Sequence, residues 1–294
     1  MKPAPFAYYA PSSVADALDA ISRTDDPEDL KVLAGGQSLV PMLNLRLAQP
    51  GTLLDINGLG RELGSIELDP AAVRVGALVR QRAAERSAVV TQWCPLLAEA
   101  LPQVAHVQIR TRGTVGGSIA HADPAAELPA VALALDALLH VTGPRGERSV
   151  PASDFFRGFF TTALAPDELL SRIDFPRLPA GTGTSFAEVS RRRGDFALVA
   201  AAAVVTVRDN RIADARLAFA GVAPCPVRSA VAESVLLGAE PTPDIVQSAA
   251  QAAAGALTPQ ADVHCSASYR RHVARVLASK TLTTAPERSV NPRD

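Results

Sequence analysis

Two short glycine-pair segments constrain this chain more than any other feature of its sequence. They are Ala34-Gly35-Gly36-Gln37-Ser38 and Thr114-Val115-Gly116-Gly117-Ser118. Because glycine has no Cβ atom, a glycine pair lets the backbone approach an anion closely and point successive N–H groups at it, and the following serine adds a hydroxyl donor. Each segment is interpreted either as part of a pyrophosphate site or as an ordinary tight turn. Neither matches the dinucleotide fingerprint G-x-G-x-x-G or a P-loop.

The first glycine pair joins a predicted strand to a predicted helix. Apolar residues 30–34 indicate the strand, and helical spacing of apolar residues resumes at Leu39. A helix over residues 12–21, with Ser12 or Ser13 as N-cap, comes before this unit, and a second strand over residues 51–56 follows it. The sequence therefore predicts a small α/β lobe that ends near Gly58.

The second glycine pair lies between a segment that predicts strands and a segment that predicts a helix. Residues 65–79 predict a β-hairpin around Asp69-Pro70, and residues 125–138 return to helical periodicity, with Pro129 expected to break or kink the start of that helix. Between them, residues 108–123 are polar and glycine-rich, so we expect no regular element there.

The last third of the chain follows a proline and glycine cluster at residues 176–183, which indicates a domain boundary. Residues 197–207 and 213–220 predict antiparallel strands joined by the polar turn 208–211. The alanine-rich residues 245–257 and the segment 269–277 predict helices.

Composition excludes several classes of protein. The 294 residues carry a net charge of -1, which gives no field to gather a nucleic acid. The longest apolar run, residues 197–205, is shorter than the roughly 20 residues that a bilayer span needs, and no signal-peptide pattern opens the chain, so we expect a cytoplasmic protein. The 3 cysteines are too few for an iron–sulfur cluster, which normally takes four thiolates. The 5 histidines lack metal-ligand spacing, so we assign no metal.

The residues around the glycine pairs resemble a known family. The strings are VLAGGQSLVPM (residues 32–42) and IRTRGTVGGSIAHADPAAELP (residues 109–129), with RGDFA (193–197) and DVHCSASYRR (262–271) further along. In this order they are similar to the FAD-binding medium subunit of molybdenum hydroxylases, most of all to the carbon monoxide dehydrogenase branch, which is related to the flavin domain of xanthine dehydrogenase. The resemblance runs almost from end to end.

The resemblance implies an α+β fold: a p-cresol methylhydroxylase-type FAD-binding fold of two α/β lobes, residues 1–57 and 58–178, plus a C-terminal α+β domain, residues 183–287. It also implies that both glycine segments wrap the FAD pyrophosphate and that Asp123 contacts the cofactor near the flavin. Phe186 stands where relatives often carry a tyrosine against the flavin ring, although a plain core role fits it equally well. Glu127 replaces a frequent aspartate. The implied cofactor-binding residues are Leu33, Ala34, Gly35, Gly36, Gln37, Ser38, Leu39, Thr114, Val115, Gly116, Gly117, Ser118, Asp123 and Phe186.

The function implied by the resemblance is that of an oxidoreductase subunit without a catalytic residue of its own, since the flavin carries the chemistry. Its FAD takes electrons from [2Fe-2S] clusters on a small partner, which a molybdopterin centre on a large partner supplies, and passes them to an external acceptor. The expected assembly is a dimer of heterotrimers. The alternative is a self-contained FAD-dependent oxidase acting on a small organic substrate. The sequence names neither the substrate nor the acceptor.

We also expect that replacing Gly36 or Gly116 with valine expels FAD while the fold survives.

Overall fold

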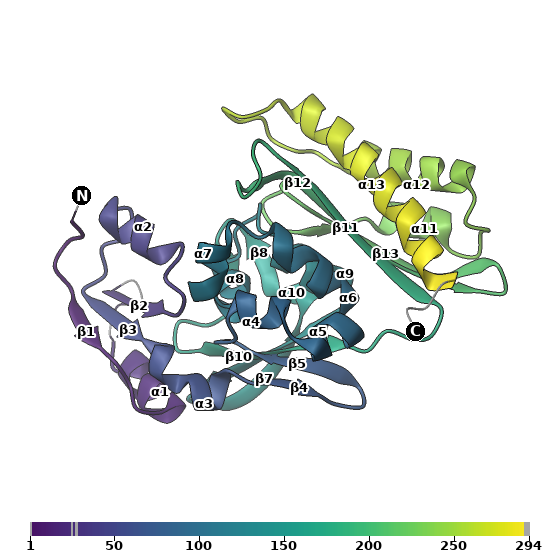
Figure 1. The fold of residues 1–294 in the computed structure, drawn as a ribbon. Helices are drawn as coiled ribbons and strands as arrows, with labels where there is room; N and C mark the ends of the chain where they lie inside the picture. Colours follow the sequence, from purple (N-terminus) through teal and green to yellow (C-terminus); the bar gives the residue numbers. More distant parts are fainter. Residues whose placement is uncertain (1, 25, 27–28, 291–294) are drawn as a thin grey trace.

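The computed structural model describes residues 2–24, 26 and 29–290. The chain begins with a small lobe around a parallel sheet in the order β1–β3–β2 (Figure 1). Its strands are β1 (Ala7–Tyr9), β2 (Leu30–Leu33) and β3 (Thr52–Asp55). Helix α1 (Val14–Ser22) begins at the predicted cap, because the Ser13 hydroxyl accepts a hydrogen bond from the N–H of Asp16, and α2 (Leu39–Asn44) follows the first glycine pair. A 3-10 segment, η2 (Ile56–Leu59), leads out of the lobe.

The second lobe is built on an antiparallel sheet in the order β4–β5–β10–β6–β7. Its strands are β4 (Ile66–Leu68), β5 (Ala72–Gly76), β6 (Leu138–Gly143), β7 (Gly146–Pro151) and β10 (Leu169–Pro176), with a separate hairpin of β8 (Phe156–Gly158) and β9 (Thr161–Thr162). Its helices are α3 (Gly60–Leu63), α4 (Gln81–Glu85), α5 (Ala88–Trp93), α6 (Pro95–Ala100), α7 (Val107–Arg112), α8 (Val115–His121), α9 (Glu127–Ala134) and α10 (Ala152–Phe155), and η3 (Leu101–Gln103) follows α6.

The C-terminal part is an antiparallel sheet in the order β11–β12–β13–β14 with helices on one face (Figure 1). The strands are β11 (Thr182–Ser190), β12 (Ala197–Arg208), β13 (Arg211–Ala220) and β14 (Val227–Arg228). The helices are α11 (Ala230–Leu236), α12 (Pro243–Ala256) and α13 (Ala267–Val290). The predicted turn between β12 and β13 is confirmed: Arg208 pairs with Arg211, and the two loop residues Asp209 and Asn210 both have positive φ, as in a type I′ hairpin turn.

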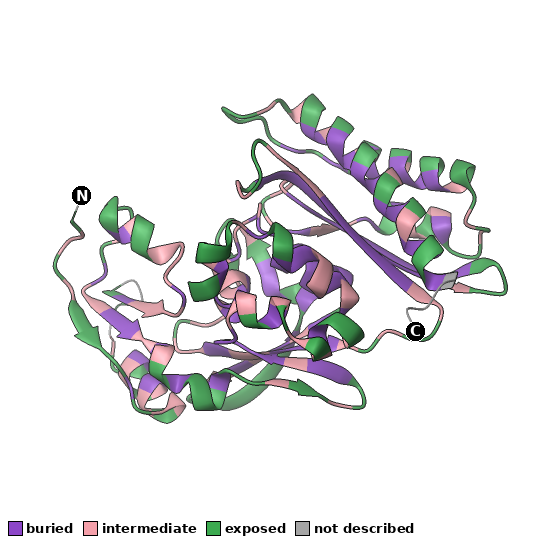
Figure 2. Ribbon diagram, viewed as in Figure 1, coloured by how far each residue is buried: buried purple, intermediate pink, exposed green. Residues whose placement is uncertain are grey.

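The strands of the C-terminal sheet are mostly buried (Figure 2), and their buried residues belong to two different cores. Strand β12 supplies Ala200 and Ala202 to a core shared with α6, α8 and α9, and it supplies Ala201 and Ala203 to a core shared with α12 and α13. Alternate residues of a strand point to opposite faces, so this one strand packs against helices on both sides. A third, smaller core joins the first lobe to the second, since Leu78 and Leu169 belong to it together with Leu54.

Three expectations from the sequence are wrong in detail. Residues 108–123, expected to be irregular, hold α7 and α8, because the Thr114 hydroxyl caps α8 and tertiary packing stabilises its glycine-containing first turn. The helix expected over residues 125–138 is the shorter α9, which begins two residues before Pro129, and Leu138 already belongs to β6. The helix expected at residues 269–277 is part of α13, which has 24 residues.

No helix in the described part of the chain combines the length and the apolar character that crossing a membrane requires.

Candidate functional site

The first glycine segment forms a turn between β2 and α2 with unused backbone donors. Gly36 has φ +72, a conformation that an L side chain rarely adopts, so glycine is required there. Within the described residues, no acceptor receives the backbone N–H groups of residues 35–38, while the Gln37 amide donates to the Gly35 carbonyl over 2.9 Å. Successive unpaired N–H groups in a tight turn form an anion-binding concavity. This segment therefore fits a phosphate group.

The second glycine segment starts α8, and most of its N–H groups already have acceptors. The N–H of Val115 donates to the Val79 carbonyl and that of Gly116 to the Ala77 carbonyl, over 2.9 and 3.0 Å. A Cβ atom on Gly116 would lie 2.5 Å from the Cα and Cβ of Ala77, so glycine lets α8 approach the chain just after β5. Gly117 is partly exposed, and its N–H donates to the Thr114 hydroxyl over 2.9 Å. The two segments thus differ: the first offers free donors, and the second gives close packing.

The structure brings the two segments together. A Cβ atom on Gly35 would lie 2.6 Å from the carbonyl oxygen of Arg112 and 2.7 Å from the Cα of Gly113, just before the second segment. A Cβ atom on Gly117 would lie 3.8 Å from the Cβ of Ala34. Two segments far apart in the sequence therefore lie against each other, as two parts of one site would.

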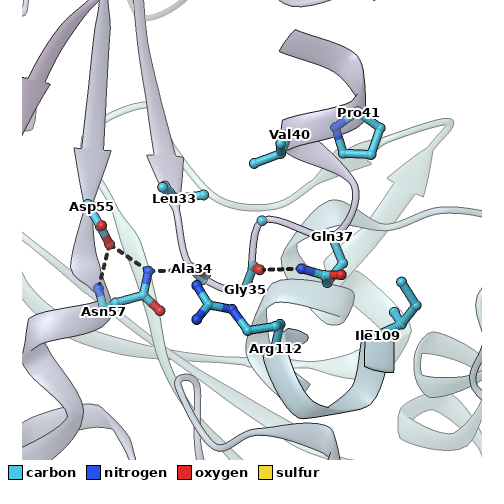
Figure 3. A pocket seen from close by; sticks show the side chains of 11 residues that line it. Leu33, Ala34, Gly35, Gln37, Val40, Pro41, Asp55, Asn57, Ile109 and Arg112 are labelled. Carbon is cyan, nitrogen blue, oxygen red and sulfur yellow. Dashed lines mark hydrogen bonds between the residues drawn. The ribbon is translucent and has the colours of Figure 1, made fainter. Parts of the chain in front are cut away.

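A hydrogen-bond network braces both segments from behind. The Asn57 amide donates to the Ala34 carbonyl over 2.7 Å and to the Asp55 carboxylate over 2.5 Å (Figure 3). The Arg80 guanidinium donates to the Asn57 side-chain oxygen over 2.6 Å and to the Arg112 carbonyl. Asn57 and Arg80 therefore connect the first glycine segment to the residue that precedes the second. Burial lowers the pKa of Arg80, and the neighbouring Arg112 charge lowers it further.

Asp55 anchors this network to the N-terminal strand. The Tyr8 hydroxyl donates to its carboxylate over 2.6 Å, and the N–H of Asn57 donates to it over 2.9 Å. Burial acts to raise the pKa of Asp55, but the hydrogen bonds from Tyr8 and Asn57 outweigh it, so that the pKa lies below the ordinary aspartate value. The lowered pKa favours the charged form of Asp55, whose carboxylate holds Asn57 in place.

A pocket of about 330 Å³ opens beside the first glycine segment (Figure 3). The Arg112 guanidinium lines it and has no salt bridge within the described residues. Backbone donors without a described acceptor, and a guanidinium whose charge acts on Asp55 but forms no described salt bridge, suit an anionic ligand such as a diphosphate. The lining residues are Leu33, Ala34, Gly35, Gly36, Gln37, Val40, Pro41, Asp55, Asn57, Ile109 and Arg112.

The remaining predicted site residues are not among those that line this pocket. Ser38 and Leu39 continue into α2, and Ser118 lies in α8. Asp123 follows the end of α8, where its carboxylate accepts a hydrogen bond from the N–H of Ala125 over 2.8 Å. Phe186, on β11, is 6% exposed and belongs to the core between the C-terminal sheet and the second lobe, so the structure does not bring it to the pocket and favours the core role.

Sequence reasoning assigned no role to Asp55, Asn57, Arg80 or Arg112. One feature could have indicated a role for Asn57, because it directly follows β3. Strands β2 and β3 are adjacent and parallel, and ligands of open α/β sheets bind at the carboxyl ends of such strands. The C-terminal signature also reaches the second lobe, since Gly194, with φ +89, packs directly against the ring of His106.

Comparisons with known proteins define the family. Residues 4–178 match the model of the FAD binding domain in molybdopterin dehydrogenase, and residues 184–285 match the CO dehydrogenase flavoprotein C-terminal domain. The chain therefore belongs to the FAD-binding subunits of molybdopterin-dependent dehydrogenases, and the resemblance seen in its sequence is confirmed, as is the fold class.

Individual relatives cover almost the whole chain. It is 40% identical to the 6-hydroxypseudooxynicotine dehydrogenase complex subunit alpha of Paenarthrobacter nicotinovorans, over 98% of this chain and 97% of that protein. It is 38% identical to the carbon monoxide dehydrogenase medium chain of Hydrogenophaga pseudoflava, over 97% and 98%. A solved structure of carbon monoxide dehydrogenase from that organism superposes with a TM-score of 0.95 over 98% of this chain and 99% of the other, at 38% identity.

Proposed function

We propose that this chain is the FAD-binding, electron-transfer subunit of a multi-subunit molybdenum hydroxylase. The proposal is supported by the contact between two distant glycine segments beside backbone donors without a described acceptor and an arginine without a described salt bridge, in a chain of this family. Bound FAD supplies the chemistry of accepting and releasing electrons, and the protein supplies binding, orientation and electrostatics.

The residues divide the work of holding the cofactor. The free N–H groups of residues 35–38 and the Arg112 guanidinium hold the diphosphate, and Asn57 and Arg80 fix the position of these groups. Gly117 allows close approach of the ligand to α8, and Asp123 lies toward the flavin. The proposed binding residues are thus Leu33 to Leu39, Thr114 to Ser118, Asp123 and Arg112. Phe186 is left out because its side chain lies in the core.

The proposed assembly places this chain with two partners, a large molybdopterin-binding subunit and a small subunit that carries [2Fe-2S] clusters. The described cysteines are three separate free thiols, of which Cys94 is buried with its pKa raised to about 12 by burial, so the clusters belong on another chain. We propose a dimer of heterotrimers in the cytoplasm. We also propose the domain division stated above: residues 1–57, 58–178 and 183–287.

The test is purification of the chain alone and then with its partners. Alone, it should bind one FAD, which acid precipitation releases, and it should not oxidise substrate. Co-expressed with neighbouring genes for a molybdopterin-binding chain and an iron–sulfur chain, it should co-elute with iron and molybdenum. A colourless protein that takes up no FAD would refute the proposal. A monomer free of iron and molybdenum that turns over substrate at full rate would establish the self-contained oxidase instead.

A further inference from the structure

The turn between β11 and β12 exposes three consecutive arginines. Arg191, Arg192 and Arg193 are all exposed, and none of them forms a salt bridge to a described residue. The side chains of Arg192 and Arg193 make no hydrogen bond within the described part of the chain either. The one acid of the turn, Asp195, is also without a described salt bridge, and residues 191–196 carry a net charge of +2. Adjacent like charges repel one another, and no described counter-ion relieves that repulsion.

The chain around this turn holds its backbone in place. The N–H of Asp195 and the Ser190 hydroxyl both donate to the Arg192 carbonyl, over 3.0 and 2.9 Å. Gly194, with φ +89, lies so close to His106 that a Cβ atom there would be 2.3 Å from the Cε1 of the ring. A turn fixed in this way has little backbone entropy to lose when its side chains bind a partner.

The loop before α13 adds apolar surface beside the arginines. The Arg191 guanidinium donates to Nδ1 of His264 over 2.8 Å, so this loop and the β11–β12 turn lie at the same end of the C-terminal sheet (Figure 1). Val263, next to His264, is 95% exposed, and Phe196, at the end of the turn, is 63% exposed. Exposed apolar side chains beside arginines are typical of protein–protein interfaces. We call residues 191–196, 263 and 264 the arginine face.

Helix α7 connects the arginine face to the cofactor pocket. His106, against which Gly194 packs, directly precedes α7, and Ile109 and Arg112 of that helix line the pocket beside the first glycine segment. The 6 residues of α7 span roughly 9 Å at 1.5 Å per residue. A partner chain on the arginine face would therefore lie close to the cofactor site.

We propose that the arginine face is the docking surface for the iron–sulfur chain, a proposal that rests on the proposed function. A [2Fe-2S] cluster with four thiolate ligands is a net anion whether oxidised or reduced, because its sulfide and thiolate charges outweigh those of the two irons. Electrons pass from such a cluster to the flavin, so the chain that carries it must contact this chain near the cofactor.

Charge complementarity favours this occupant over a second copy of the chain. Arginines beside an apolar patch attract an anionic surface and orient it during approach. A two-fold interface between two copies would bring the same arginines of both copies together, which like-charge repulsion opposes. The iron–sulfur chain is therefore the partner that fits the arginine face.

Charge reversal on the arginine face tests the proposal through the rate of flavin reduction. The FAD-loaded chain is mixed with the purified iron–sulfur chain from the neighbouring gene, whose clusters are reduced beforehand. Each cluster gives one electron, the flavin takes up two, and the buffer supplies the protons. At about 10 mM salt, where the Debye length is roughly 30 Å, Arg192→Glu and Arg193→Glu together should lower the second-order rate constant about tenfold. At about 1 M salt, where that length is roughly 3 Å, the difference should disappear.

Arg208→Glu is the matched control. Arg208 is exposed at the other end of the 12-residue strand β12, roughly 40 Å away at 3.3 Å per residue, and its side chain has no described partner. This variant lowers the net charge as each reversal on the arginine face does, but it should leave the rate constant unchanged. Val263→Ser alters no charge and should instead raise the dissociation rate of the complex a few-fold at both salt concentrations, measured by surface plasmon resonance.

The outcomes separate this proposal from the proposed function. Failure of the unmodified chain to bind FAD, or to accept electrons from the clusters, would refute both. Unchanged rate constants of the reversed variants at low salt would refute the docking surface alone. Reversed variants that keep their rate constants but no longer co-purify with the molybdopterin-binding chain would assign the surface to that chain. A reversed variant that loses FAD would place its arginine in the cofactor site, which also overturns the proposal.

Discussion

Replacing Gly35 with alanine tests the contact between the two glycine segments. The new Cβ atom would lie 2.6 Å from the Arg112 carbonyl oxygen and 2.7 Å from the Gly113 Cα. Both are backbone atoms, so no side-chain rotation relieves the overlap. Carbon atoms pack at about 3.5–4.0 Å, and the segments must therefore separate by roughly 1 Å. Overpacking of this kind costs about 1–3 kcal/mol.

We expect this cost to reduce FAD affinity more than stability. Without ligand, the first glycine segment can move away from Arg112, because its N–H groups are held by no described acceptor. With FAD bound, the segment must return to place its N–H groups on the diphosphate. A cost of about 1–3 kcal/mol in the bound state weakens binding by roughly 5- to 150-fold. Titration of the FAD-free protein by flavin fluorescence measures this change.

Gly255→Ala provides the matched control. Gly255 lies in α12, and its added Cβ atom would meet no heavy atom within 4 Å. This variant should bind FAD like the unmodified chain and gain about 0.5 kcal/mol of stability in urea unfolding from the lower backbone entropy cost. If Gly35→Ala binds FAD with unchanged affinity, the two segments do not act as one site and the reasoning fails.

Three further variants test other parts of the structure. Asn57→Ala removes the hydrogen bonds to Ala34 and Arg80; at a net ~1 kcal/mol per bond, it should weaken FAD binding at least tenfold, measured by the same titration. Gly116→Val should lower the free energy of unfolding even without FAD, against the expectation from sequence that the fold survives, because the side chain meets Ala77; urea unfolding checks this. Burial raises the pKa of Glu188 on β11 to about 8 in the folded state, whereas the unfolded group titrates near 4.3. Stability should therefore fall as pH rises from about 5 to 8, and Glu188→Gln should flatten that part of the profile, which urea unfolding at several pH values measures.

The sequence predicted the parts of the site that depend on local chemistry. The strand before Gly35 and the helix after it are confirmed, since apolar runs and a glycine break are properties of neighbouring residues. Helix α8 was missed because its glycines weaken local helix propensity, whereas Ala77 and Val79 stabilise it through tertiary contacts. Helix α7 has only 6 residues and ends at Gly113, too short a stretch for helical periodicity to stand out.

The bracing network and the buried acids could not be predicted in the same way. Asn57 contacts Ala34 and Arg80, each 23 positions away, and no periodicity links such residues. Of the buried acids, Glu127 begins α9 and Glu188 lies on β11, with six elements of the second lobe between them in the sequence, and the β11–β12–β13 register places them in one region. Contacts of this kind follow from topology, which a single sequence does not specify.

The alanine-rich strand β12 also determines how the protein unfolds. Its two faces belong to the two largest cores, so both cores lose part of their packing when the strand detaches. A chain cut between residues 178 and 183 would give an N-terminal fragment with an open apolar surface where Ala200 and Phe186 had been, prone to self-association. The second lobe and the C-terminal sheet should thus melt in one cooperative step. The first lobe is joined to the second by a smaller core that includes Leu54, Leu78 and Leu169, so it can open earlier and admit or release a ligand while the two larger cores stay intact.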